Sequence, residues 1–156
     1  GLSVPELLER YGTRAAELSA TLQPSQFSVI LSSFARVAYR HEGMIKAFTK
    51  RMPPRLPHFL PMNFCQICNA YARFQEKEEG LFRRFSAEMP HKLPLFEGFQ
   101  LAQVAHAYAR LSIRDDLLFD DLADEVIRRP QEFDHRGLVR IAGAFGHFGM
   151  RHPRLW

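Results

Sequence analysis

Three arginines and one histidine recur in the sequence at a constant step of 37 residues (73 − 36, 110 − 73 and 147 − 110). These residues, which we call the basic column, are Arg36, Arg73, Arg110 and His147. A guanidinium group binds phosphate oxygens through paired N–H donors, and it also stacks on nucleobases. Arginine near the end of a helix equally suits the helix dipole and caps free carbonyl groups. The sequence alone leaves both roles open.

Two further columns repeat with the same 37-residue step. The first precedes the basic column by seven residues and the second by four, so all three share one helix face. Their members are Val29, Gln66, Gln103 and Arg140, and Ser32, Asn69, His106 and Gly143. Amide, hydroxyl and imidazole groups hydrogen-bond the edges of unpaired bases. The candidate RNA-binding residues are therefore Arg36, Gln66, Asn69, Arg73, Gln103, His106, Arg110, Arg140 and His147. The same side chains also suit a solvated surface or a face that contacts another protein.

The cysteine pair Cys65 and Cys68 has the spacing of a metal or redox motif, but it falls within a predicted helix and has no second pair. In the other repeats small or aliphatic residues occupy these positions. We therefore interpret both cysteines as buried fillers, and we expect no metal site and no cofactor.

No group of residues favours catalysis. The acidic residues Asp115, Asp116, Asp120, Asp121, Asp124 and Glu125 spread around the polar face of one predicted helix. Such a face repels phosphate, so bound RNA would avoid it. Gly143, Gly146 and Gly149 are predicted to be small residues within a helix, and the seven histidines show no metal-ligand or triad spacing. We expect no enzymatic activity and assign no catalytic residue.

The columns belong to a repeat in which the aromatic positions are Phe34, Tyr71, Tyr108 and Phe145. Within one copy, Phe64, Ile67, Cys68 and Tyr71 have the spacing of one helix face, and a second helical stripe follows from Leu81 to Met89. Two helices make a hairpin, and a single hairpin cannot bury both stripes, whereas stacked hairpins share one core. The sequence predicts an all-α fold, an α-solenoid of stacked helical hairpins with a 37-residue repeat.

The predicted unit boundaries follow from this register. Residues 1–23 form a half repeat, 24–60, 61–97 and 98–134 form full repeats, and 135–156 form a partial repeat. Proline-rich junctions end the second helices, since proline disfavours helix in the residue before it. Leu7, Tyr11, Leu138, Leu155 and Trp156 are assigned to core columns. The apolar end at Leu155 and Trp156 predicts either a longer repeat protein or an end that docks on a partner.

Composition adds two weaker indications. A formal net charge of +4 is compatible with a polyanionic partner. No apolar run approaches the roughly 18 residues of a membrane span, so we expect no membrane insertion.

The pattern of Phe64, Ile67, Cys68, Ala70-Tyr71-Ala72-Arg73 and a second helix opening Leu81-Phe82 resembles the heptatricopeptide repeats, and their octotricopeptide relatives, of organellar RNA-binding proteins. The resemblance covers the whole chain. It implies a mitochondrial matrix protein that holds or stabilises RNA in RNA processing or ribosome function, with RNA and other ribonucleoprotein subunits as partners. The alternative is a structural scaffold in a large mitochondrial assembly, in which the same faces contact proteins.

Overall fold

The computed structural model describes residues 1–152, and within this range the chain is entirely helical, with no β-strand. The all-α class is therefore confirmed. The α-helices are α1 (Val4–Glu17), α2 (Pro24–Arg36), α3 (Glu42–Arg51), α4 (Pro61–Phe74), α5 (Glu79–Glu88), α6 (Gly98–Arg110), α7 (Asp116–Arg128) and α8 (His135–His147). The 3-10 helices are η1 (Ser19–Thr21), η2 (Pro53–His58), η3 (Pro90–Leu95) and η4 (Pro130–Glu132). None of the described helices is long and apolar enough to cross a lipid bilayer.

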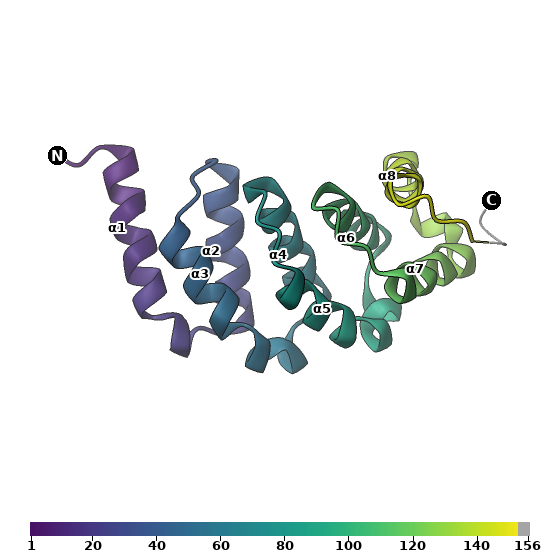
Figure 1. Cartoon of the computed structure of the whole chain (residues 1–156), viewed down its shortest axis with the longest axis horizontal. Helices are drawn as coiled ribbons and strands as arrows, with labels where there is room; N and C mark the ends of the chain where they lie inside the picture. The colour runs from purple at the N-terminus through teal and green to yellow at the C-terminus, as the bar shows by residue number, and fades with distance from the viewer. Residues whose placement is uncertain (153–156) are drawn as a thin grey trace.

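The helices follow one another in a single row, from α1 at one end to α7 and α8 at the other (Figure 1). Helix α4 packs between α2 and α6, and α6 packs between α4 and α8, so these four helices make one continuous layer. In the other layer α1 contacts α3 directly, whereas α5 and α7 contact the 3-10 helices η2 and η3. The proline-rich junctions thus act as short spacers beside α5 and α7.

Three helices of the continuous layer, α2, α4 and α6, share the same local device at their starts, whereas Asp134 caps α8 by accepting from the Gly137 N–H. Asn63 accepts a hydrogen bond from the Leu60 backbone N–H (2.7 Å), and Gln26 and Gln100 do the same for residues 23 and 97. A side chain three residues into the helix thereby satisfies one backbone donor that the helix leaves free. At the start of α1, Ser3 and Glu6 form a reciprocal capping box.

One residue with positive φ follows each helix of this layer. These residues are Ala38, Gln75, Ser112 and Gly149, with φ of 56°, 58°, 53° and 63°. In each case the backbone N–H of the following residue donates to the carbonyl of one of the four aromatic positions of the repeat, which we call the aromatic column (Phe34, Tyr71, Tyr108 and Phe145). The Glu76 N–H, for example, donates to Tyr71 O at 2.9 Å. The expectation that Gly149 lies within a helix is wrong, because α8 ends at His147 and Gly149 makes the left-handed turn after it.

The core is aromatic and continuous. Phe64, Phe85 and Phe82 are fully buried, with Phe64 and Phe85 edge to face at 5.7 Å between ring centroids. By contrast, the predicted core residues Leu7, Tyr11 and Leu138 are 54%, 55% and 42% exposed, because within residues 1–152 no helix covers them. Leu155 and Trp156, also predicted to be core, lie outside the described residues.

Hydroxyl groups in the aromatic column pair with the preceding unit. The Tyr71 hydroxyl lies 2.6 Å from Thr49 Oγ1, and the Tyr108 hydroxyl lies 2.8 Å from Ser86 Oγ. Burial is the main cause that raises the pKa of both phenols. Each buried tyrosine thus has a hydroxyl partner that satisfies it, as burial of a polar group requires.

Replacing Tyr108 with phenylalanine is expected to lower the free energy of unfolding by about 1–2 kcal/mol, because the change removes hydrogen bonds to Ser86 and to the Phe82 carbonyl. Urea unfolding followed by circular dichroism measures the loss. Tyr39→Phe, which removes an exposed hydroxyl bonded to Glu9, is the control and should leave stability unchanged. Equal stability of the Tyr108 variant and the wild type would contradict this account of the column.

Candidate RNA-binding surface

The basic column lies at the carboxyl-terminal ends of α2, α4, α6 and α8, and all four side chains are exposed. Arg110 lines one hollow together with Arg73 and Arg40. It lines a second hollow together with His106, Arg140 and His147. Because both hollows share Arg110, a basic surface continues from α4 across α6 to α8. Arg36 is at the equivalent place on α2 but lines neither hollow.

The arginines of the basic column have free guanidinium groups. Arg36, Arg73 and Arg110 make no hydrogen bond or ion pair with any residue in the range 1–152. His147 Nε2 lies 3.0 Å from Ser112 Oγ. Three exposed cations that have no partner in the described part of the chain are available to bind an anion from outside.

The carbonyl groups at the helix ends are instead capped by a different pair of arginines. Arg40 donates to Phe74 O at 2.9 Å, and Arg114 donates to Phe148 O at 2.7 Å. The capping role considered for the basic column is thus carried by Arg40 and Arg114, four residues further along. What remains for the basic column is a favourable interaction with the helix dipole.

The two polar columns lie beside the basic column. Their candidate RNA-binding residues are all half-buried, and they are Gln66, Asn69, Gln103, His106 and Arg140. Gln103 is already engaged, because its Oε1 accepts a hydrogen bond from the Cys65 thiol at 2.6 Å. Burial lowers the pKa of His106, and the nearby Arg140 and Arg110 lower it further. A neutral imidazole offers one donor and one acceptor, which suits a base edge.

Both cysteines are buried and free. Burial raises the pKa of the Cys65 thiol to about 12, although Arg140 acts in the opposite direction. Burial also raises the pKa of Cys68. Both are therefore protonated at neutral pH, and Cys65 serves as a donor to the next helix. Within the described range, no three His, Cys, Asp or Glu side chains gather closely enough to hold a metal ion.

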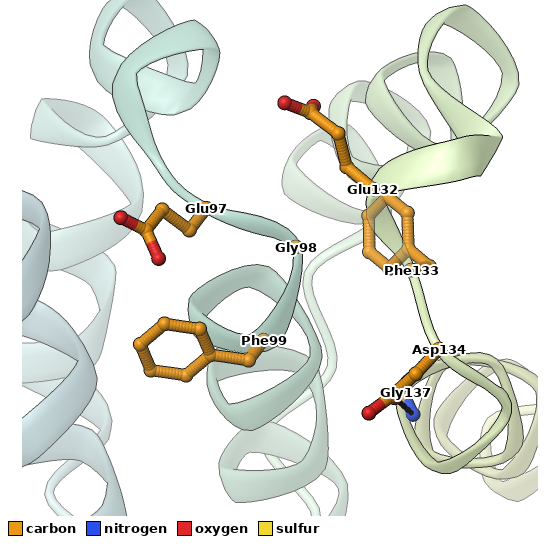
Figure 2. A pocket seen from close by; sticks show the side chains of 7 residues that line it. All are labelled: Glu97, Gly98, Phe99, Glu132, Phe133, Asp134 and Gly137. Atoms are coloured by element: carbon orange, nitrogen blue, oxygen red, sulfur yellow. Dashed lines mark hydrogen bonds between the residues drawn. The ribbon is translucent and has the colours of Figure 1, made fainter.

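An acidic hollow lies at the opposite ends of the same helices, between the starts of α6 and α8 (Figure 2). Three acidic residues, Glu97, Glu132 and Asp134, are among those that line it. Glu132 also pairs with Arg129 at 2.9 Å, and Asp134 accepts a hydrogen bond from the Gly137 N–H. The backbones approach closely here, since a Cβ on Gly98 would lie 2.2 Å from the Glu132 carbonyl oxygen. On α7, burial and the neighbouring carboxylates raise the pKa of Asp121. Negative charge thus marks surfaces that a phosphate backbone would avoid.

A further set of basic residues serves to join the units. Arg55 donates to Ala20 O (2.6 Å), Lys92 to Leu56 O (3.2 Å) and Arg129 to Leu93 O (2.9 Å). These residues, which we call the bridging column, recur at the same 37-residue step, and this is the signal in the sequence that could have revealed them. Each side chain satisfies backbone carbonyls of the preceding junction. These cations are consequently not available for a ligand in the way that the basic column is.

Together the fold and the surface define an all-helical protein with one basic and one acidic end to its continuous helix layer. A family model described as RNA-editing substrate-binding complex 6 protein matches residues 7–156. The chain therefore belongs to this family. No curated protein matches it significantly.

Proposed function

We propose that this chain binds RNA along the basic surface of α4, α6 and α8, and that it acts as a non-enzymatic subunit of an RNA-editing substrate-binding complex. The observation that carries the proposal is that Arg36, Arg73 and Arg110, at equivalent helix ends, have no hydrogen-bond or ion-pair partner within residues 1–152. The name of the family supports RNA and other protein subunits as partners. It also supports a mitochondrial location, for which we propose the matrix.

We further propose that the helices form an α-solenoid of 37-residue hairpins similar to heptatricopeptide repeats, with units 24–60, 61–97 and 98–134 and partial units 1–23 and 135–156. Helices α2, α4, α6 and α8 begin at residues 24, 61, 98 and 135, which keep this step. In such an array each unit presents equivalent side chains to successive parts of a ligand.

In this proposal the guanidinium groups of Arg73 and Arg110 bind phosphates or stack on bases, while Gln66, Asn69 and His106 hydrogen-bond base edges. Gln103 contributes only if it exchanges its bond to Cys65, and Arg140 and His147 extend the surface over α8. The acidic hollow keeps the RNA at the other end of the helices. Single-stranded or irregular RNA fits this arrangement, because its bases are free to stack and pair with side chains.

A scaffold role is the second candidate, and exposed aliphatic residues favour it. Leu60 and Leu95 are 66% and 73% exposed at helix ends opposite the basic column, and Leu117 is 79% exposed at the start of α7. Where exposed apolar residues gather into one patch, they are typical of contacts with other proteins. The two candidates differ in their response to salt, because only phosphate binding releases condensed counterions.

Changing Arg36, Arg73 and Arg110 together to glutamine is expected to weaken binding to mitochondrial RNA by about ten- to a hundredfold at low salt. The slope of log affinity against log salt should fall by about 2, since each phosphate contact to a single strand contributes roughly 0.7. Fluorescence anisotropy across a salt series measures both quantities.

The matched control changes Lys46, Lys50 and Arg84 to glutamine. These residues carry the same total charge, are exposed on α3 and α5, and make no hydrogen bond or ion pair within residues 1–152. This control should bind RNA nearly as the wild type does. Equal losses of RNA affinity in both triple variants would show a general charge effect. If the folded wild type bound no RNA, the scaffold role would be favoured instead.

A further inference from the structure

The hollow that Arg110 shares with α8 lies between the carboxyl-terminal halves of α6 and α8, and we call it the basic hollow. These two helices pack directly on each other. Its volume is about 380 Å³. Pockets that hold small molecules have volumes of about 300–1,000 Å³. The buried residues Ala109 and Ala144 form the floor of the basic hollow, which is therefore small-sided and apolar.

Gly143 lines the basic hollow and leaves it open, because it has no side chain. The equivalent residues of α2, α4 and α6 are Ser32, Asn69 and His106, which all carry polar side chains. A Cβ placed on Gly143 would meet no neighbouring atom within 4 Å. Packing within residues 1–152 thus does not require glycine at this position, where it weakens the helix. Glycine in such a place allows a ligand to approach the backbone closely.

Three polar side chains lie together at the rim of the basic hollow, namely His106, Arg110 and Arg140. Both guanidinium groups are close enough to the imidazole to lower its pKa, in addition to the larger effect of burial. None of the three makes a hydrogen bond or an ion pair with a residue in the range 1–152. The donors of the arginines, and the donor and acceptor of a neutral imidazole, are consequently available to a ligand.

An aromatic ring completes the rim. His147 Nε2 lies 3.0 Å from Ser112 Oγ, and the His147 ring packs edge to face on Phe148, with 4.9 Å between the ring centroids. These two contacts hold the imidazole in place beside the apolar floor. Unpaired bases stack on imidazole rings and hydrogen-bond through their edges. A phosphate group needs cations alone, whereas a floor, a ring and edge donors together suit a nucleobase.

We propose that the basic hollow takes one unstacked nucleobase of a bound RNA, and that guanine binds there most tightly. The inference rests on the proposed RNA-binding function and adds to it a base pocket at a defined place. The base lies over the alanine floor beside His147, and Arg110 and Arg140 donate to its edge. Guanine suits these donors, because its N7 and O6 are adjacent acceptors that one guanidinium group contacts through two hydrogen bonds.

The test uses oligomers of abasic ribose phosphate that carry a single base at the centre, either guanine or 7-deazaguanine, or no base at all. All three have the same phosphates, so they differ only at the base. In fluorescence anisotropy with the full-length chain, the guanine oligomer should bind about tenfold more tightly than the base-free oligomer. The 7-deazaguanine oligomer, which lacks the N7 acceptor, should bind with intermediate affinity.

Gly143→Leu fills the basic hollow without a change in charge. It should lower the affinity for the guanine oligomer to that for the base-free oligomer, and leave the latter affinity unchanged. Gly146→Leu is the matched control, because Gly146 is also on α8, a Cβ there would meet no neighbouring atom within 4 Å, and it does not line the hollow. This control should keep the wild-type preference for guanine. Circular dichroism verifies that both variants are folded.

Two kinds of failure can be told apart. If the wild type bound the guanine and base-free oligomers equally, or if Gly143→Leu kept the preference, the base pocket would be overturned while phosphate binding stood. Equal binding of guanine and 7-deazaguanine would overturn the assigned contact with N7. If the wild type bound none of the oligomers at low salt, the proposed function would fail, and the base pocket with it.

Discussion

Replacing Phe85 with alanine is expected to lower the free energy of unfolding by about 3–5 kcal/mol, the range measured for removal of a fully buried aromatic ring. Phe85 has no exposed surface, and its ring centroid lies 5.2 Å from Phe82 and 5.7 Å from Phe64. Phe82 lies on α5 itself, and the contact with Phe64 joins α5 to α4. The cavity would therefore lie between the two layers, and the loss should spread to the neighbouring units, because a stacked repeat depends on its nearest neighbours.

Denaturant unfolding measured by circular dichroism gives the magnitude, and hydrogen exchange locates the loss. Phe99→Ala is the matched control, because Phe99 lies on α6 but is 48% exposed. This control should change stability little. If the Phe85 variant unfolded at the wild-type denaturant concentration, its assignment as a core residue linking the layers would fail.

The second large effect is expected at Arg129, where replacement with alanine should cost about 3 kcal/mol or more. Arg129 Nε bonds Glu125 Oε2 at 3.0 Å, and its Nη atoms bond Phe96 O and Leu93 O at 2.6 and 2.9 Å. The Glu125 side chain is only 4% exposed. The substitution would leave this carboxylate short of a partner and two carbonyl groups of the preceding junction unsatisfied.

Arg128 supplies the control for this prediction. It also pairs with Glu125, at 3.0 Å, but its side chain is 61% exposed and water can replace it. Arg128→Ala should therefore destabilise the protein much less than Arg129→Ala, by the same denaturant titration. Similar losses for the two variants would mean that the pairing with Glu125 matters, and that the bridge to the preceding junction does not.

The helical class was predictable because its cause is local and repeated. Phe64, Ile67 and Tyr71 fall on one helix face whatever surrounds them, and proline marks the start of α2 and α4. The burial of Tyr71 and Phe85 followed from the same columns. The exposure of Tyr11 and Leu138 did not, because a column shows which residues are suited to burial and does not show whether a neighbouring helix covers them.

The left-handed turns were not predictable from residue type. Ala38, Gln75 and Ser112 adopt positive φ without being glycine, because the hydrogen bonds that close each first helix hold them there. Glycine at position 149 was the sole compositional sign, and the sequence pattern placed it in a helix instead.

For the candidate surface, the columns predicted the equivalent positions but not their partners. Arg36 and Arg40 are four residues apart and chemically identical, yet only Arg40 caps the next helix and pairs with Glu76. The separation into bridging and free cations depends on how the units stack. It depends also on the reach of long side chains, which periodicity in a sequence does not encode.

The contacts that hold the row together have a consequence for how the chain is made. Within residues 1–152, the main packing contacts of the continuous layer join adjacent units, α2 with α4, α4 with α6 and α6 with α8. No unit must wait for a distant segment to arrive, which is the property that makes low-contact-order proteins fold fast. A ribosome delivers such a chain in the order in which it assembles. The early units can therefore complete their packing while the later ones are still being synthesised.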